Sequence, residues 1–362
     1  MTNLIRIPGR LRLLLALVLA AVGLVAGGLA DACTRAVYLG KDNEVITARS
    51  MDWKEDIQSD LWIFPRGMQR NGEAGANSLK WTSKYGSVIA SAYGVSTTDG
   101  VNEAGLAANL LWLVESQYPA FDASSKPGLT IAAWAQYLLD NFATVQEAVD
   151  ALQGEPFTLV TDKVPGQDRA ATLHLSISDA SGDSAIIEYI GGRQVIHHSR
   201  QYQVMTNSPI FEQQLALNSY WQQIGGTVML PGTNRASDRF ARASFYVNAL
   251  PKFDDPDIAI AAMFSVIRNA SVPFGILTPD EPNISSTRWR TVVDHRRKLY
   301  FFESALTPNT FWVDLKKLDF SAETGQVKTL TLGPDARNIF AGETSAKFKV
   351  AKPFRFLGLS PS

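Results

Sequence analysis

The sequence predicts an α+β protein, because strand-forming and helix-forming segments occupy separate blocks of the chain. The order is a block of strands, two helices, a second block of strands, two more helices and a final strand pair. Alternating apolar and polar residues mark the strands, whereas apolar residues three and four apart mark the helices. No internal repeat or low-complexity linker interrupts the pattern, so residues 33–362 are predicted to form a single domain.

The first block begins with two short β-prone runs at residues 34–38 and 45–48, and Gly40-Lys41-Asp42-Asn43 supplies the turn between them. Asp99-Gly100 is interpreted as another turn. By the same criteria we expect further strands at residues 61–64, 87–92, 105–113, 172–178, 184–189, 289–294 and 299–303. The last two are close enough to form a C-terminal hairpin.

Four segments have the apolar spacing of helices. They are residues 129–139, 145–152, 237–250 and 256–267. The second has the clearest start, since Thr144 and Glu147 have the spacing of a capping box.

The first 32 residues have the pattern of a signal peptide. Three arginines precede an apolar run from Leu13 to Ala30, and Ala30-Asp31-Ala32 has the small residues that signal peptidase requires. Cleavage after Ala32 would make Cys33 the N-terminal residue of a periplasmic or secreted protein with no stable membrane span. Signal peptidase alone or a further autocatalytic step could expose Cys33, and the sequence does not distinguish the two.

Two alternatives explain the same N-terminal pattern. The apolar run could be an uncleaved anchor, or Cys33 could be lipidated and attach a binding protein to a membrane. The charged Asp31 fits a lipidation site poorly. Cys33 is also the only cysteine in the chain, so it has no disulfide partner, and an exported thiol without a partner favours a catalytic role.

The composition argues against several other classes of function. The formal net charge is -1 and there is no basic run, so nucleic-acid binding is not expected. Neither a dinucleotide fingerprint nor a phosphate-binding loop is present, and we expect no cofactor. The four histidines do not form a metal motif, because neighbours such as His197 and His198 on a strand point to opposite faces. We therefore expect no metal.

Arg49 and Asp52 follow the second expected strand and are candidates for chemistry with Cys33. A hairpin of the first two strands would bring them beside Cys33. A cation there favours the thiolate, and a carboxylate could hold the free amine of Cys33. An exposed Arg–Asp pair at a strand end is an equally open interpretation at this point.

Six motifs, taken together, occur in the order seen in the choloylglycine hydrolase family. They are Cys33-Thr34-Arg35, Arg49 with Met51-Asp52-Trp53, Pro65-Arg66-Gly67, Asn102-Glu103-x-Gly105-Leu106-Ala107, Thr206-Asn207-Ser208-Pro209 and Ser237-Asp238-Arg239-Phe240. The residues around His174 and Glu188 also resemble a hairpin of that family. The likeness runs over nearly the whole chain after residue 32.

This resemblance implies a four-layer αββα sandwich of the N-terminal-nucleophile hydrolase type, acting on a small-molecule N-acyl amide. It implies that Cys33 is the nucleophile and that Arg49 and Asp52 lie beside it. Asn207 is similar to the side chain of the family's oxyanion hole. Arg239 matches a further active-site arginine.

Trp112 matches the position whose backbone N–H completes the oxyanion hole. Together with Trp53 it resembles the Gram-negative branch, whose members are similar to penicillin V acylases and also cleave N-acyl homoserine lactones. Bile salt hydrolases have Asn at this position, so bile salt hydrolysis is the less favoured alternative. The two tryptophans would form an apolar acyl pocket. A homo-oligomer, either a dimer or a tetramer, is also expected. The stretch between Asn207 and Arg239 looks shorter than in Gram-positive members of the family, in which an extra loop there helps the tetramer to assemble.

Overall fold

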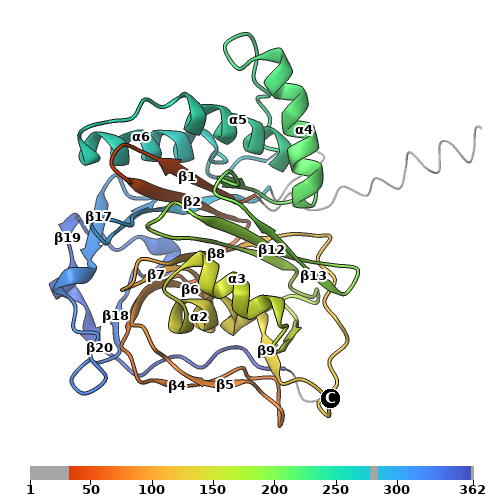
Figure 1. Ribbon diagram of the computed structural model, residues 1–362. Helices are drawn as coiled ribbons and strands as arrows, with labels where there is room; N and C mark the ends of the chain where they lie inside the picture. Colours follow the sequence, from red (N-terminus) through yellow and green to blue (C-terminus); the bar gives the residue numbers. More distant parts are fainter. Residues whose placement is uncertain (1–31, 278–283, 360–362) are drawn as a thin grey trace, which may run out of the picture.

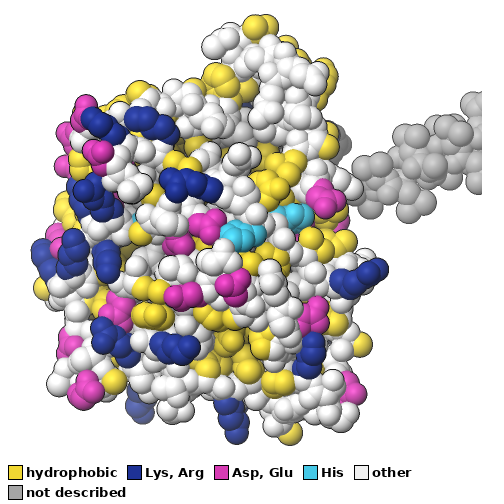
Figure 2. All heavy atoms as spheres, in the orientation of Figure 1, with side chains coloured by type: hydrophobic (Ala, Val, Ile, Leu, Met, Phe, Trp, Pro, Cys, Tyr) yellow, Lys and Arg dark blue, Asp and Glu magenta, His cyan; other side chains and the backbone are white. Residues whose placement is uncertain are grey.

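The computed structural model describes residues 32–277 and 284–359. The predicted signal peptide therefore lies outside the described residues, except for Ala32. Within the described ranges no helix combines the length and apolarity that a membrane crossing requires. Figure 2 shows Lys and Arg side chains interspersed with Asp and Glu on the face in view, without a broad basic surface.

Two β-sheets lie face to face, and helices cover the outer side of each (Figure 1). The seven-stranded sheet contains, in spatial order, β14 (Val204–Met205), β1 (Thr34–Leu39), β2 (Val45–Trp53), β15 (Ser286–Asp294), β16 (Leu299–Ser304), β17 (Thr310–Asp314) and β19 (Gly342–Glu343). The nine-stranded sheet contains β13 (Arg193–His198), β12 (Ser184–Ile190), β11 (Leu173–Ser178), β8 (Ala107–Trp112), β7 (Ser96–Asn102), β6 (Ser87–Ala92), β3 (Leu61–Phe64), β18 (Lys328–Leu330) and β20 (Lys349–Val350).

The helices divide between the two sheets. α5 (Ala236–Ala249) and α6 (Pro256–Asn269) pack on β1 and β2, and α4 (Phe211–Ile224) packs on α5. α2 (Ile131–Asn141) and α3 (Val145–Gln153) pack on β7 and β12 of the other sheet. Two short strand pairs join β4 (Gln69–Asn71) to β5 (Lys80–Thr82) and β9 (Gly128–Thr130) to β10 (Thr158–Val160). The αββα architecture is confirmed.

In the middle of the nine-stranded sheet, β6 and β8 are buried along their whole length because both faces are covered. In β8, Leu110 packs in the cluster under α2 and α3, whereas Leu111 packs in the cluster between the sheets. Ile89 and Ala90 of β6 divide in the same way. Successive side chains of a strand point to opposite faces, so each strand supplies both cores.

The expected β1–β2 hairpin is confirmed, with Thr34 opposite Ser50. The start of α3 is confirmed too, since the Glu147 N–H donates to Thr144 Oγ1 over 3.2 Å. The interpretation of Asp99-Gly100 as a turn is wrong, because both residues lie inside β7. Asp99 is buried there and accepts hydrogen bonds from β8 and β16, which replace the solvent that a turn would supply.

α4 was not predicted from the sequence. Its buried residues are Phe211, Gln214 and Asn218, so the covered face is mostly polar and has no apolar stripe to reveal a helix. β7 was missed for a related reason. Its buried positions include Thr97, Asp99 and Asn102, which are residue types typical of turns.

A substitution at Gly100 can test whether this residue lies inside β7. A Cβ at this residue would lie 2.6 Å from Ile89 Cγ2 and 2.7 Å from the Val88 carbonyl oxygen. We therefore expect Gly100→Ala to lower the free energy of unfolding by about 1–3 kcal/mol, measured by urea denaturation. Gly154→Ala is the matched control, because its Cβ would meet nothing nearer than 3.6 Å, and it should change the free energy by less than about 0.5 kcal/mol. Equal effects would contradict the placement.

Candidate active site

Cys33 lies directly before β1 and is 3% exposed. In the β1–β2 register Arg35 is opposite Arg49, which places Cys33 across from Met51. Arg49, Met51 and Trp53 alternate along β2 and line the same pocket as the thiol. The hairpin therefore brings Cys33, the residue before β1, to the inner face of the seven-stranded sheet.

Arg49 is the cation nearest the thiol, with Nη2 4.0 Å from Sγ. Its guanidinium donates to the Leu110 carbonyl over 3.0 Å and lies over the Trp289 ring at 4.6 Å. Burial raises the pKa of the Cys33 thiol to about 11, and the positive charge of Arg49 opposes part of that rise. In the unprocessed chain the thiol is therefore protonated at neutral pH and requires a base to ionise.

Asp52 lies on the same strand, and its carboxylate accepts from Thr287 Oγ1 over 2.5 Å and from Ser50 Oγ over 3.3 Å. Burial raises the pKa of Asp52 to about 6, against the lowering effect of Arg239. The contact predicted for Asp52 is with the free Cys33 amine that cleavage would create. In the unprocessed chain that nitrogen is a peptide N–H and not a free amine, and it donates to Asn207 Oδ1 over 2.5 Å.

Asn207 and Arg239 lie far from Cys33 in the sequence but contact it directly. Arg239, from the first turn of α5, donates to the Cys33 carbonyl and to Thr34 Oγ1 through Nη1. Its Nη2 donates to Asn207 Oδ1 over 2.8 Å. Asn207 Nδ2 in turn donates to the Trp112 carbonyl over 2.7 Å. Because each polar atom of the Asn207 amide has a partner of the required type, its orientation is fixed.

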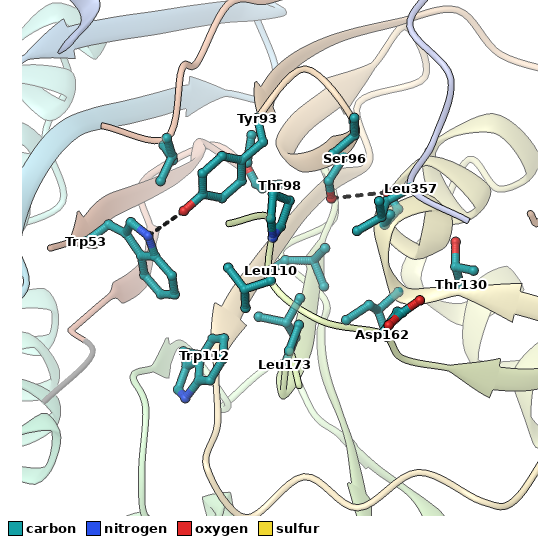
Figure 3. A pocket seen from close by; sticks show the side chains of 18 of the residues that line it. Trp53, Tyr93, Ser96, Thr98, Leu110, Trp112, Thr130, Asp162, Leu173 and Leu357 are labelled. Carbon is teal, nitrogen blue, oxygen red and sulfur yellow. Dashed lines mark hydrogen bonds between the residues drawn. The ribbon is translucent and has the colours of Figure 1, made fainter. Parts of the chain in front are cut away.

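The thiol opens into an apolar pocket of about 830 Å³, its mouth included. Trp53 and Trp112 form one wall, with ring centroids 5.4 Å apart, and Tyr93 accepts a hydrogen bond from Trp53 Nε1 over 2.8 Å (Figure 3). At the other side of the view lie Thr130, Asp162 and Leu357. The guanidinium of Arg169 lies 4.2 Å from the Trp112 centroid and 5.2 Å from that of Trp53.

The comparison with family models gives one match, to the linear amide C–N hydrolases of the choloylglycine hydrolase family, over residues 33–329. The chain belongs to this family. It is therefore a linear amide C–N hydrolase, as the motifs predicted.

Two proteins with high sequence identity to this chain are named penicillin V acylases. That of Pectobacterium atrosepticum is 62% identical over 348 residues, which are 91% of this chain and 93% of the relative. The solved structure of the Agrobacterium tumefaciens enzyme superposes with a TM-score of 0.85 at 70% identity, over 90% of this chain and all of that one. A mutant conjugated bile acid hydrolase of Clostridium perfringens shares the fold, with a TM-score of 0.71 at 22% identity and 86% and 98% coverage.

Of the residues predicted for this choloylglycine hydrolase site, Cys33, Arg49, Trp53 and Trp112 line the pocket. The other three, Asp52, Asn207 and Arg239, lie outside the pocket lining and contact Cys33 directly. Two further groups support them. Behind Arg49, Asp99 accepts from Tyr300 over 2.6 Å and from Asn109 over 2.7 Å. Behind Asn207, His174 and Glu188 form a buried pair. The pairing of His174 with Glu188 and the contacts of Asp99 were not predicted, because they depend on which side chains face each other once the strands pair.

The described histidines contact protein groups. His174 and His197 both pair with Glu188, His198 pairs with Asp183, and His295 bonds to the Gly105 carbonyl. Among the described residues no group of three or more His, Cys, Asp or Glu side chains is arranged to hold a metal ion.

The electrostatic effect of Arg49 can be measured on the thiol. We expect Arg49→Gln to slow alkylation of Cys33 by iodoacetamide about tenfold or more at pH 8.5 in the unprocessed chain, because the pKa of Cys33 rises when the cation is lost. Arg66→Gln is the control, since Arg66 is half-exposed and pairs with Glu103. An unchanged or faster rate in Arg49→Gln would contradict the assignment.

Proposed function

We propose that Cys33, freed at its amine by removal of residues 1–32, cleaves the acyl side chain of penicillin V, of N-acyl homoserine lactones, or of both. The observation that carries the proposal is the position of the only thiol of the chain. It lies in an apolar pocket, with the cation of Arg49 on one side and the Asn207 amide on the other. This arrangement fits an apolar acyl group whose carbonyl carbon lies at the sulfur.

The proposed reaction begins with proton transfer from Sγ to the free amine of Cys33. An α-amine has a pKa of about 7.7–8.0, so it accepts a proton near neutral pH and returns it later. The sulfur attacks the amide carbonyl carbon, and the protonated amine then gives its proton to the leaving nitrogen as the C–N bond breaks. A water molecule, deprotonated by the same amine, attacks the thioester carbonyl carbon. The C–S bond breaks, the acyl group leaves as its carboxylic acid, and the amine returns the proton to the sulfur. No cofactor enters these steps.

Two N–H groups are proposed to hold the oxyanion. Asn207 Nδ2 uses one hydrogen for the Trp112 carbonyl, and its second is available to a substrate oxygen. The Leu113 N–H donates to the carbonyl of Thr172, the residue before β11. The N–H of Trp112 therefore points the other way, to the side from which Asn207 approaches. Asp52 is proposed to contact the free amine once cleavage has replaced the peptide bond.

The choice of substrate rests on the pocket and on the named relatives. Trp53 and Trp112 offer flat apolar surfaces to a phenoxyacetyl group or an alkyl chain. The two relatives above 60% identity are named penicillin V acylases, whereas the bile acid hydrolase is only 22% identical. Bile salt hydrolysis is therefore the second candidate. Export to the periplasm or medium, and a dimer or tetramer, remain predictions of the sequence.

The nucleophile is tested by Cys33→Ala in the processed protein. We expect penicillin V hydrolysis, followed by release of 6-aminopenicillanic acid, to fall by about 10³-fold or more, because the other groups provide only part of the rate. Arg66→Gln, at a half-exposed residue that pairs with Glu103, is the control and should keep most of the activity. Full activity in Cys33→Ala would overturn the proposal, as would a lipid adduct on Cys33 of the active protein.

The depth of the pocket is tested by Leu357→Trp, which adds bulk at the side opposite Trp53 and Trp112. We expect kcat/KM for a dodecanoyl homoserine lactone to fall at least about tenfold, while that for a butanoyl homologue changes by less than about threefold. Ile339→Trp, at an exposed residue, is the control. Equal losses for the short and the long chain would show that the acyl group lies elsewhere.

A further inference from the structure

Three ionisable side chains on neighbouring strands lie behind Asn207. His174 of β11, Glu188 of β12 and His197 of β13 come from adjacent strands of the nine-stranded sheet. His174 Nδ1 lies 3.1 Å from Glu188 Oε1, and His197 Nε2 lies 3.3 Å from Oε2. The side chains of His174 and Glu188 are 2% and 1% exposed, so the surrounding protein and not water must satisfy them.

His174 also reaches the turn that carries Asn207. Its Nε2 lies 2.8 Å from the Thr206 carbonyl oxygen. A carbonyl oxygen only accepts, so Nε2 must carry a hydrogen. The other ring nitrogen faces the Glu188 carboxyl, and that contact needs a second hydrogen, on Nδ1 or on the carboxyl. The pair therefore holds two hydrogens, the equivalent of an imidazolium beside a carboxylate.

The same pair fixes both ends of the segment that contains Asn207. His174 binds the residue before Asn207, and Glu188 accepts from the Phe211 N–H at 3.1 and 3.2 Å where α4 begins. From inside α4, Gln214 donates to the Asn207 carbonyl over 3.1 Å. A change in the pair would thus move the Asn207 amide relative to Cys33.

We propose that His174 and Glu188 position the Asn207 amide for oxyanion binding, and that they do so only while the pair holds both hydrogens. This inference rests on the proposed function, in which Asn207 is an oxyanion donor. Loss of the second hydrogen would leave the Nδ1 lone pair facing a carboxylate. That repulsion would separate the two side chains and loosen the Thr206–Asn207 turn.

The groups around the pair determine how it titrates. Burial alone would raise the pKa of Glu188, but hydrogen bonds from His174 and His197 outweigh it and lower that pKa to about 2. His197 of β13 is the other titratable group that faces the carboxyl. The turn contributes the Thr206 carbonyl and α4 contributes the Phe211 N–H, neither of which titrates. The carboxylate is thus ionised through neutral pH, so the second hydrogen of the pair lies on Nδ1 of His174.

Glu188→Gln separates this role from ordinary packing. A Gln side chain has nearly the same shape, and its NH₂ donates to Nδ1 of a neutral His174 while Nε2–H still binds Thr206. We expect wild-type kcat for penicillin V to fall at alkaline pH with KM little changed. In Glu188→Gln we expect kcat near pH 7 within about threefold of wild type and no such alkaline fall. Asp183→Asn is the matched control, since it alters the partly exposed His198–Asp183 pair at the same hairpin and should keep the wild-type profile.

The number of hydrogens on the His174 ring can be measured without any activity assay. The chain has only four histidines, so ¹⁵N NMR of the ring nitrogens resolves them, and His174→Gln assigns the signal. We expect His174 to show two protonated nitrogens at pH 7 and to lose one in the pH range where kcat falls. A singly protonated ring at pH 7 would overturn the proposal, as would the same alkaline profile in Glu188→Gln and wild type.

A third variant separates this inference from the proposed function. His174→Phe removes both hydrogen bonds, and we expect kcat to fall about 10²-fold with KM little changed, as when an oxyanion donor is displaced. Unchanged kcat in His174→Phe would overturn the positioning role. Asn207→Ala with full activity would instead overturn the proposed function, while the NMR count of hydrogens on His174 would stand.

Discussion

The amide of Asn207 joins three of the four layers of the protein. Its oxygen accepts from the Cys33 nitrogen at the start of the seven-stranded sheet and from Arg239 of the helix layer. Its nitrogen donates to the Trp112 carbonyl of the nine-stranded sheet. An amide rotated by 180° would place like groups against each other at all three contacts. The geometry around the thiol therefore depends on this one side chain.

The site also contains buried charged side chains, whose removal from water lowers the stability of the protein. Arg49, Asp52 and Arg239 are all fully buried, and Nε and Nη1 of Arg49 have no hydrogen-bond partner in the part of the chain that the structure describes. The guanidinium donates through Nη2 to the Leu110 carbonyl and to Met51 Sδ, and it also faces the thiol and the Trp289 ring. Buried polar atoms without partners are rare in proteins and concentrate where function outweighs stability. A buried cation of this kind is expected if its function is to stabilise a thiolate.

The parts of the site that are local in sequence could be predicted from the sequence. A turn between two short strands was enough to bring Arg49 and Asp52 beside Cys33, because strand register follows from turn length. Asn207 and Arg239 lie 174 and 206 residues from Cys33, and only the resemblance to a family pointed to them.

Other features could not be predicted, for identifiable reasons. Asp99 and Gly100 have the composition of a turn, but tertiary contacts from Asn109 and Tyr300 make them part of a strand. α4 lacks an apolar stripe because it covers polar groups. His174 and Glu188 meet only after two strands pair, so no spacing in the sequence reveals their shared hydrogens.

The central claim is that the Cys33 sulfur forms the acyl bond. Its most direct test is intact and peptide mass spectrometry of the processed protein, quenched in acid during turnover of penicillin V. We predict a phenoxyacetyl group on the N-terminal peptide that begins with Cys33, removed by hydroxylamine as a thioester should be. An acyl group on another residue, or active protein in which residues before Cys33 are still attached, would contradict the account.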